Sequence, residues 1–593
     1  MKENWMLVNK KESFLRLSSA MDENPLVLRL LANREINSVK EAKRFLYGTI
    51  NDLYDPYLMK DMDKGIKIIK ESVLNKKKVT VYGDYDCDGV VSTSILFKAL
   101  ENIKANFNYY IPNREDEGYG MHSGRIKKLK KDGTQVILTC DNGISAFEEV
   151  KLAKELGMEI IITDHHDIPI RENKDGEFKE TIPNADAVIN PKRSDCKYPF
   201  KNLCGAGIAL KFAKCLYDEF KISEKKFLEL VELAAIATVC DVVDLVDENR
   251  IIVKKGLELL NKSKNSGIQE LRKVKELINK KIEEYHLGFV IGPCINATGR
   301  LETADLSVEL LITEDIEMAK YLAVQLNELN TRRQDLTKES SDKIIEKIET
   351  ENINKEKVIV VYEESVHESI AGIVAGRIKE KYNKPCIVIT KGKEIPKASA
   401  RSIEAYNMFE ELSKCSELLE KFGGHPMAAG LSIKEENIIP LRKKLNSICK
   451  LTENDMIPVV KIDSPLSFNY LNEDLIKIIE SLKPFGKGNS SPLFAVKNVF
   501  IERIWLIGKE NNFLKLRFKF KSNGRVLYID GLSFDKLDNF KEGVIEKYGE
   551  EKFNGACASS YLNINSDIIY YPSINEFNGK RNIQVMIKNI RIK

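Results

Sequence analysis

The strongest chemical signal in the sequence is a short segment with three aspartates. Gly83-Asp84-Tyr85-Asp86-Cys87-Asp88-Gly89 places three carboxylates within five residues. An apolar run at 79–82 precedes it and predicts a buried strand, and a helical pattern follows it. Carboxylates buried this close together repel one another and are tolerated mainly where a cation neutralises them. The segment therefore predicts a metal site.

Two further predicted strands end in polar residues that bind metals. The strand at 136–139 runs into Cys140-Asp141-Asn142-Gly143, and the strand at 159–163 runs into Asp164-His165-His166. A later predicted helix ends in Cys240-Asp241. In open α/β sheets ligands gather outside the carboxyl ends of the strands, so these side chains should converge at one edge.

A mixed oxygen and nitrogen ligand set suits Mn²⁺ or Mg²⁺ better than a thiolate-rich zinc centre, and the histidine favours Mn²⁺. Two such ions would hold a phosphodiester and activate a water. A calcium loop of the EF-hand type needs a preceding helix and a glutamate at its twelfth position, where this chain has Ser94 or Ile95. A helix cap remains the ordinary alternative for any single aspartate, but caps do not require histidines.

The elements around these residues predict an α/β fold with a parallel sheet covered by helices on both faces. Helical patterns at 90–103 and 144–156 alternate with predicted strands at 79–82, 107–111, 136–139, 159–163 and 187–190.

The rest of the chain predicts three more regions. Residues 225–350 are helical in pattern, and 315–349 predict a long connecting helix, either continuous or broken. A second α/β lobe follows, with strands at 358–362 and 386–390 and helices at 370–382 and 405–422. Runs at 514–520, 526–529 and 583–587 indicate a β-rich C-terminal domain.

Composition sets broad limits on the protein class. A chain of 593 residues is too long for one hydrophobic core, and its net charge of +4 does not by itself indicate nucleic acid. No run of 18 apolar residues occurs, and the N-terminus lacks a secretory h-region. Eleven cysteines without a C-x-x-C pair indicate free thiols. We expect a cytoplasmic protein.

Several motifs together resemble a known family. The metal-site segments GDYDCDG, CDNGIS and DHH are joined by IPNREDEGYG at 111–120, CGAGIA at 204–209, GPCINATGRL at 292–301, ASARS at 398–402 and FGGHPMAAGLS at 422–432. In these motifs the chain resembles the RecJ single-stranded-DNA-specific exonucleases of the DHH phosphoesterase superfamily, from about residue 50 to the end.

The resemblance implies a domain order. It is an N-terminal helical segment (1–50), a DHH phosphoesterase domain (51–310), a connecting helix (311–350), a DHH-associated domain (351–451) and an OB-type nucleic-acid-binding domain (452–593). It also implies metal-dependent hydrolysis of single-stranded DNA from the 5′ end to mononucleotides, in recombination and repair. A helicase and a single-strand-binding protein are the expected partners of a monomeric enzyme.

By motif match, the two metals would be held by Asp86, Asp88, Asp141, His165 and Asp241, with Asp84 beside them. His166 would support the scissile phosphate or a ligand, so His166, Asp141 and Asp84 are the expected catalytic residues.

The resemblance also places substrate-binding residues. The terminal 5′-phosphate and backbone would be gripped by Arg114, Arg300, Ser399 and Arg401, with His425 from the second lobe and Tyr119 stacking on a base. A surface salt bridge is the ordinary alternative for one arginine, and a packing role for His425. Cys294 stands where the family usually has arginine, Val366 where tryptophan is expected and Asp244 where proline is common.

Basic and aromatic residues interleave between 501 and 531. In 515–521 the basic residues alternate with Leu516, Phe518 and Phe520, as expected for a strand with one core face and one basic face. That basic face is either a solvated surface or, as an OB-type domain implies, a DNA-tracking surface.

Two other functions remain open at this stage. One is a DHH-type phosphodiesterase of short oligonucleotides or cyclic dinucleotides, and residues 452–593 argue against it. The other is a non-catalytic replication scaffold, and the intact carboxylate motifs argue against it.

Overall fold

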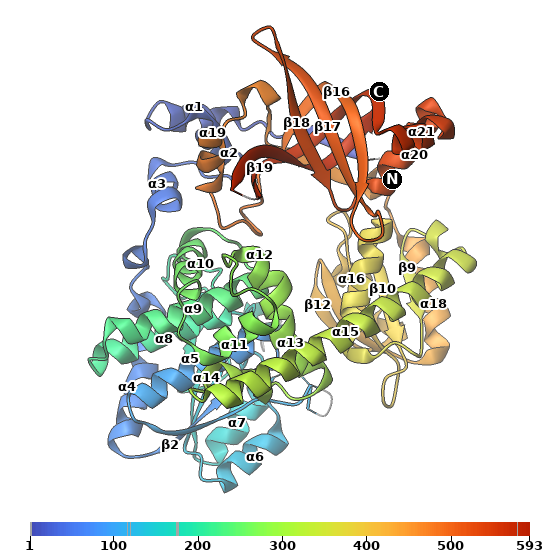
Figure 1. Cartoon of the computed structure of the whole chain (residues 1–593). Coiled ribbons are helices and arrows are strands. Elements are labelled where there is room, and N and C mark those ends of the chain that lie inside the picture. Colours follow the sequence, from blue (N-terminus) through green and yellow to red (C-terminus); the bar gives the residue numbers. More distant parts are fainter. Residues whose placement is uncertain (1–2, 115–116, 119, 173–176, 578) are drawn as a thin grey trace. The chain divides into compact units, whose positions relative to one another are not determined.

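The computed structural model describes residues 3–114, 117–118, 120–172, 177–577 and 579–593. The chain divides into two compact units, one formed by Thr49–Ile457 and the other by Met1–Gly48 together with Pro458–Lys593. Figure 1 shows the elements of both. None of the helices in the described ranges is both long and apolar enough to cross a membrane.

The first sheet of the larger unit is entirely parallel, as expected for an α/β fold. Its strand order is β3 (Asn106–Tyr110), β2 (Lys78–Tyr82), β4 (Val136–Cys140), β5 (Glu159–Thr163) and β8 (Ala187–Ile189). All five strands lie within one or two residues of the predicted ones.

Helices cover both faces of this sheet because strand side chains alternate between the faces. Val79 and Val81 belong to the core formed with α4 (Met62–Leu74), α5 (Cys87–Asn102) and α8 (Gly205–Glu219). Ile160 and Ile162 belong to the core formed with α6 (Ser123–Lys131) and α7 (Phe147–Glu155). A two-stranded excursion, β6 (Ile170–Glu172) with β7 (Phe178–Glu180), follows β5.

A helical layer follows the sheet. It contains α9 (Glu224–Cys240), α10 (Asp247–Leu260), α11 (Ser266–Val274), α12 (Glu284–His286), a π-helical turn (Leu287–Ile291), α13 (Gly292–Leu301) and α14 (Asp305–Ile312).

The long helix α15 (Ile316–Thr350) is continuous over 35 residues, so the alternative of a broken helix is wrong. Asp315 caps it by accepting the N–H groups of Glu317 and Met318, and its interior holds neither glycine nor proline.

The second sheet has the order β12 (Leu419–His425), β13 (Ala428–Ile433), β11 (Lys397–Arg401), β10 (Cys386–Thr390) and β9 (Ile359–Tyr362). Only the β9–β10 pair is parallel. The sheet as a whole packs with α16 (Ala371–Tyr382), α17 (Met408–Ser413) and α18 (Ile438–Ile448).

The helix predicted over 405–422 is wrong beyond residue 413. Helix α17 ends after two turns, and from Leu419 the chain forms a strand that pairs with β13. The partner strand begins only three residues after β12 ends, so a short hairpin offers hydrogen bonds to the backbone groups on the inner side of this edge strand. The pair Gly423-Gly424 also disfavours helix.

The smaller unit is built on a closed barrel. Strands β16 (Phe494–Ile507), β17 (Phe513–Ser522), β18 (Arg525–Ser533), β20 (Lys580–Ile592) and β19 (Tyr561–Phe577) pair in that order, and β19 pairs back to β16. The short β15 (Ser464–Pro465) pairs in parallel with the start of β16, and α19 (Glu473–Glu480) lies between these two strands in the sequence. Helices α20 (Leu537–Tyr548) and α21 (Glu550–Ser559) link β18 to β19. The β-rich C-terminal domain is therefore confirmed.

The first 48 residues belong to this smaller unit. Strand β1 (Asn4–Leu7) pairs in parallel with β14 (Val459–Ile462), and side chains of α1 (Lys11–Ser18), α2 (Pro25–Asn33) and α3 (Val39–Tyr47) enter the same core as the barrel. Arg34 of this segment forms an ion pair of 3.3 Å with Asp463. No local pattern in the sequence indicates this long-range pairing.

Candidate active site

The predicted metal residues lie together at the carboxyl edge of the first sheet. The Nε2 atom of His165 lies 3.1 Å from Asp141 Oδ1, 3.7 Å from Asp88 Oδ2 and 3.9 Å from Asp241 Oδ2. Ligand atoms lie within 4.8 Å of one another in three groups: Asp84, Asp86 and Asp141; Asp88, His165 and Asp241; and Asp141, His165 and His166. The ends of three parallel strands, β2, β4 and β5, and two helix ends thus deliver these side chains to one place.

Helix ends fix two of the carboxylates. Asp86 is the N-cap of α5 and accepts the N–H of Gly89 at 3.0 Å. The carboxylate of Asp88 accepts the backbone N–H groups of Gly205 at 2.6 Å and Ala206 at 2.8 Å, at the first turn of α8. Such donors at a helix N-terminus hold an anion in one orientation. Asp86 therefore caps a helix, as the ordinary alternative for an aspartate expects, and also belongs to the group of possible metal ligands.

The position of Asp141 depends on close backbone packing. Its φ is +61°, in the left-handed region, and a Cβ atom on Gly205 would lie 2.7 Å from the Cβ of Asp141. The neighbouring Asn142 side chain donates to the carbonyl of Gly83 at 2.9 Å and ties the β2 and β4 loops together. Glycine at 205 thus allows the first turn of α8 to approach Asp141.

The pKa values of the two neighbouring histidines, His165 and His166, are shifted in opposite directions. Burial, together with the charge of His166, lowers the pKa of His165 to about 3, so its imidazole is neutral and able to ligate a metal. Burial opposes protonation of His166 as well, but a hydrogen bond of 2.7 Å between its Nδ1 and Asp164 Oδ1 raises its pKa to about 9. One ring is therefore a ligand and its neighbour a cation.

Asp164 lies in this site, although the sequence analysis assigned it no role. It is fully buried, and besides the His166 ring its carboxylate accepts the backbone N–H groups of His165, His166 and Ile144. Burial raises its pKa, but the hydrogen bond from His166 and the positive charge of that ring outweigh burial and lower it to about 2. Its place directly before two histidines was the available signal.

The carboxylate cluster holds more negative charge than its protein surroundings neutralise. Burial, followed by repulsion from Asp86, raises the pKa of Asp88 to about 7, and burial and Asp88 raise that of Asp241 to about 8. The pKa values of Asp84 and Asp141 are raised well above normal for the same reasons. Among the described residues, the buried Oδ1 atom of Asp84 has no hydrogen-bond partner. Divalent cations fit this donor set, because they neutralise the charge and satisfy the free oxygen.

A group of arginines shows the converse pattern. Burial and the charges of Arg114 and Arg333 lower the pKa of Arg300 to about 10, and burial and Arg114 lower the pKa of Arg401. Arg300 donates to the carbonyl of Ser369 at 2.6 Å and Arg401 to that of Ala400 at 2.8 Å, and neither forms an ion pair within the described part of the chain. These are cations that lack anions, as in a phosphate-binding site.

The second sheet presents part of this group on one face. Arg401, Ala428 and His425 are in register across β11, β13 and β12, and Ser399 lies two residues before Arg401. Aligned positions share a face, so Ser399, Arg401 and His425 point to the same side. His425 is exposed. On one side of Ser399 the aligned positions of β13 and β12 are glycines, Gly430 and Gly423, which leaves the surface open in that direction. On its other side β10 places the buried Val388 opposite Ser399.

A cavity of about 510 Å³ opens at this position. Its lining includes Arg114 and Ser399, with Lys397 and Lys421 adding positive charge. The guanidinium of Arg114 also lies over the ring of Tyr85, 5.0 Å from its centroid. The structure thus brings together four of the predicted phosphate-binding residues. Tyr119 lies outside the described residues.

Comparisons with known proteins agree with this geometry. Residues 78–238 match the model of the DHH family N-terminal domain, 355–451 the DHHA1 domain and 462–589 the RecJ OB domain. Single-stranded-DNA-specific exonuclease RecJ of Bacillus subtilis (strain 168) is 36% identical over 580 residues, which cover 97% of this chain and 69% of that protein. RecJ of Haemophilus influenzae is 30% identical over 606 residues, covering 98% of this chain and 99% of that protein.

The chain belongs to the RecJ family of single-stranded-DNA-specific exonucleases.

Solved structures share the RecJ fold. The complex of Thermus thermophilus RecJ with Mn²⁺ has a TM-score of 0.80 at 24% identity and covers 99% of this chain and 79% of its own. An exonuclease RecJ bound to manganese has a TM-score of 0.57 at 29% identity and covers 67% of this chain and 96% of its own. The predicted family and fold class are confirmed, and the domain boundaries stay predictions.

Two of the three departures from the usual RecJ motifs fall at buried positions, and the third, Asp244, is half-buried. Cys294 is fully buried in α13 and donates its thiol to the carbonyl of Val290 at 3.2 Å. Val366 is also buried, in the core beneath α16. Both side chains are apolar and are accommodated by packing.

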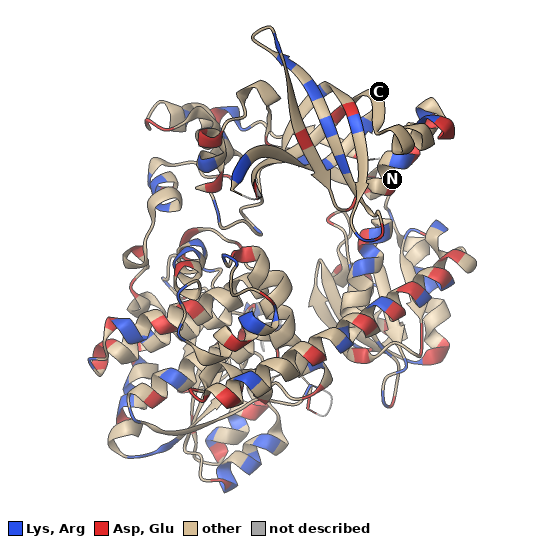
Figure 2. Cartoon of the chain, in the orientation of Figure 1, with Lys and Arg blue, Asp and Glu red and all other residues tan. Residues whose placement is uncertain are grey.

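The basic face of the RecJ OB domain differs from the arginine group. Leu516 and Phe518 are buried, as predicted, and Phe520, predicted on the same face, is partly buried against that core. Leu514 is buried with them. On the other face, Arg517 binds Asp530 through two hydrogen bonds of 2.8 and 3.2 Å. Lys515 pairs with Asp530 at 3.0 Å and Lys519 with Glu502 at 3.3 Å. Figure 2 shows that basic and acidic positions are interspersed on the barrel strands. This face is largely neutralised within the protein.

Proposed function

We propose that this protein is a metal-dependent exonuclease that hydrolyses single-stranded DNA from the 5′ end to mononucleotides. The observation that carries the proposal is a cluster of uncompensated carboxylates beside a group of uncompensated arginines within one compact unit. The first fits metal cations and the second fits phosphate, and hydrolysis of a phosphodiester needs both.

Metal ions bound at this site supply an activated water and neutralise charge on the scissile phosphate. The residues that would hold them are Asp84, Asp86, Asp88, Asp141, His165 and Asp241. His166, protonated at neutral pH through its bond to Asp164, is placed to donate a hydrogen bond to a phosphate oxygen. Asp164 fixes the ring and its charge, so it acts as a positioning residue.

The arginine group supports the 5′ polarity. A terminal phosphate monoester carries more negative charge than an internal diester. It should therefore bind more tightly to this arginine group, because it relieves more of the repulsion between the guanidinium charges. We propose that Arg114, Arg300, Ser399, Arg401 and His425 hold this terminal phosphate. A strand end held there presents its first internal diester to the carboxylate cluster, which makes the enzyme an exonuclease.

The OB barrel offers a second contact for the strand. A groove of about 880 Å³ on the barrel is lined by aromatic and apolar side chains such as Phe520, Leu527 and Tyr528, with Lys580 and Arg581. Exposed rings stack on bases without sequence preference. We propose that this groove tracks the single strand. A helicase, a single-strand-binding protein, a monomeric state and a cytoplasmic location remain predictions.

End-labelled substrates test the proposal directly. Purified protein with Mn²⁺ receives single strands of DNA or RNA labelled at the 5′ or 3′ end, and Asp141→Ala serves as the inactive control. Release of mononucleotides from the 5′ end of DNA is the expected result. Cleavage confined to dinucleotides, or release from the 3′ end, contradicts the proposal.

A further inference from the structure

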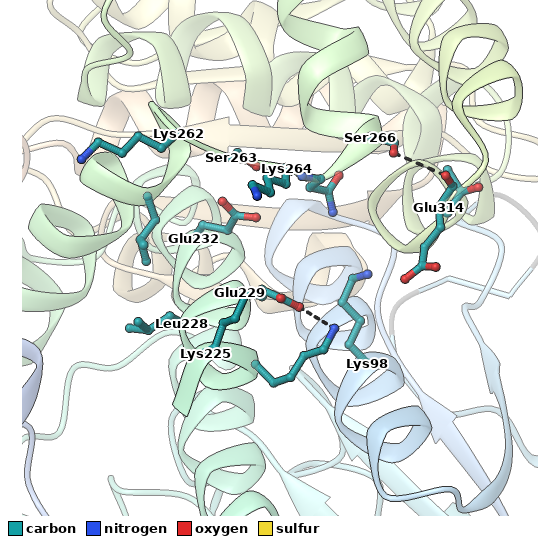
Figure 3. A pocket seen from close by; sticks show the side chains of 14 residues that line it. Lys98, Lys225, Leu228, Glu229, Glu232, Lys262, Ser263, Lys264, Ser266 and Glu314 are labelled. Carbon is teal, nitrogen blue, oxygen red and sulfur yellow. Dashed lines mark hydrogen bonds and ion pairs between the residues drawn. The ribbon is translucent and has the colours of Figure 1, made fainter. Parts of the chain in front are cut away.

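A second charged cavity lies in the first lobe, on helices that also carry metal ligands. It has a volume of about 350 Å³ and is shown in Figure 3. Its walls come from α5, the first turns of α9, the end of α10, the loop before α11 and the residues between α14 and α15. This volume is within the range of small-molecule sites.

The cavity is far from the carboxylate cluster along both helices. Lys98 lies ten residues after Asp88 on α5, and Glu232 lies nine residues before Asp241, which caps α9. At 1.5 Å per residue, each separation is about 15 Å. The cavity is therefore distinct from the proposed metal centre.

Positive charge dominates the lining. Five lysines, Lys98, Lys225, Lys226, Lys262 and Lys264, face three glutamates, Glu229, Glu232 and Glu314. Lys226 is paired with Glu229 at 2.9 Å. In the described ranges, Lys225, Lys262 and Lys264 have no carboxylate within ion-pair distance. Three lysines at the exposed rim are thus available to an anion.

The interior has a different character from the rim. Glu232 is 6% exposed and Ser263 is 9% exposed, whereas the rim lysines Lys225, Lys262 and Lys264 are exposed. Burial raises the pKa of the Glu232 carboxyl to about 7. Leu228 and Leu259 also line the cavity. A flat polar group would find an apolar wall and one hydrogen-bonding carboxyl here.

The loop between α10 and α11 connects the rim to the interior. Its sequence Lys262-Ser263-Lys264-Asn265 turns sharply, since Ser263 Oγ accepts the N–H of Asn265 at 3.1 Å and Asn265 caps Ile268. The nine-residue helix α11 begins at Ser266 on the cavity wall, so the positive end of its dipole adds to the lysine charge.

We propose that this cavity binds a nucleoside phosphate, with the phosphate on Lys262, Lys264 and Lys225 and the nucleoside against Glu232, Ser263 and the two leucines. The charge at the rim matches the phosphate, and the buried carboxyl matches a donor on a base or sugar. The site is independent of the exonuclease function proposed above.

Calorimetric titration of the full chain in EDTA tests the site. The probes are the four deoxynucleoside 5′-monophosphates, deoxyadenosine and inorganic phosphate. An Arg401→Ala background weakens binding at the proposed terminal-phosphate site. We expect at least one monophosphate to bind below about 1 mM, and deoxyadenosine and phosphate to bind at least tenfold more weakly.

Matched variants locate the binding. Lys262→Ala/Lys264→Ala should weaken the monophosphate at least tenfold, while Lys127→Ala/Lys128→Ala, which removes the same charge from the exposed face of α6, should leave it unchanged. Glu232→Gln should change the preference among bases without abolishing binding. Exonuclease activity without added nucleotide should be equal in both double variants. Absence of binding by every monophosphate at 5 mM, equal affinity in the two double variants, or phosphate alone binding as tightly as the nucleotides would overturn the proposal.

Discussion

The carboxylate cluster and the basic face of the OB barrel are both rich in charge, yet they differ in how that charge is balanced. Asp88, Asp141 and Asp241 converge with one neutral imidazole, and their pKa values are raised by burial and by one another. On the barrel, Lys515, Arg517 and Lys519 each meet a carboxylate of a neighbouring strand.

This difference distinguishes a ligand-binding site from an ordinary charged surface. Buried like charges cost free energy that bound cations or protons offset, so the cluster indicates a cation site. Exposed pairs of opposite charge are common and contribute little to stability, so the barrel face alone indicates no ligand. The arginine group follows the first pattern with the sign reversed.

The largest expected effect is at the carboxylate cluster. Asp141→Asn keeps the shape of the side chain but removes a negative ligand, and it should lower kcat by roughly a thousandfold, about 4 kcal/mol in the barrier. Asp132→Asn, at an exposed aspartate that caps the end of α6, is the control and should be neutral. Steady-state release of mononucleotides gives the rates. Equal loss in both variants, or full activity of Asp141→Asn, would break the comparison.

An intermediate effect is expected in the arginine group. Arg401→Ala should raise KM for 5′-phosphorylated DNA about 10- to 100-fold, since a charge-assisted phosphate contact is removed. The penalty should be smaller on 5′-hydroxyl strands, and Arg377→Ala, at an exposed position of α16, should have no effect. A loss of the same size on both strand types would place Arg401 outside the terminal-phosphate site.

The metal-free protein should show the cost of the unbalanced charge through pH. The pKa values of Asp88 and Asp241 are raised in the fold to about 7 and about 8, so protons neutralise the cluster as pH falls from 9 to 7. The raised pKa of His166, about 9, acts in the same direction. In EDTA the free energy of unfolding should therefore rise over this window, and Tm with it by a few degrees.

Saturating Mn²⁺ should remove this dependence, because metal binding replaces the protons. Thermal melts at pH 7, 8 and 9 with and without Mn²⁺ make the measurement. A metal-free Tm that falls from pH 9 to pH 7 is the contrary outcome.

The smallest effect is expected on the barrel. Asp530→Asn frees Lys515 and Arg517, so it should tighten binding of single-stranded DNA about two- to fivefold at low salt and steepen the salt dependence. Asp538→Asn, at an exposed position on α20, is the matched control. Fluorescence anisotropy with an Asp141→Asn background measures both. Weaker binding in Asp530→Asn would show that the pairs organise the DNA-binding surface instead of masking it.

Local patterns in the sequence were enough to predict the parallel sheet and the convergence at its edge. Apolar runs such as 159–163 mark buried strands, and parallel strands must end at one edge, so Asp141 and His165 had to approach each other. The hairpin at Leu419–His425 was missed because its apolar spacing fits a helix as well as a strand, and only pairing with Ala428–Ile433 decides between them. The pairing of β1 with β14 joins segments far apart in the sequence, and no local pattern predicts it.

The sequence also did not predict which charged side chains are neutralised by a partner within the protein. The basic positions of β17 were visible, but their partners Asp530 and Glu502 lie on other strands and depend on register. Asp164 was visible too, but its role depends on burial and on the His166 ring.

Anomalous diffraction from a crystal grown with Mn²⁺ and an inactive Asp141→Asn counterpart tests the central claim most directly. The account predicts two manganese peaks among Asp84, Asp86, Asp88, Asp141, His165 and Asp241 in the wild-type protein, and loss of at least one peak in the variant. Absence of manganese from this cluster, or two unchanged peaks in the variant, would contradict it.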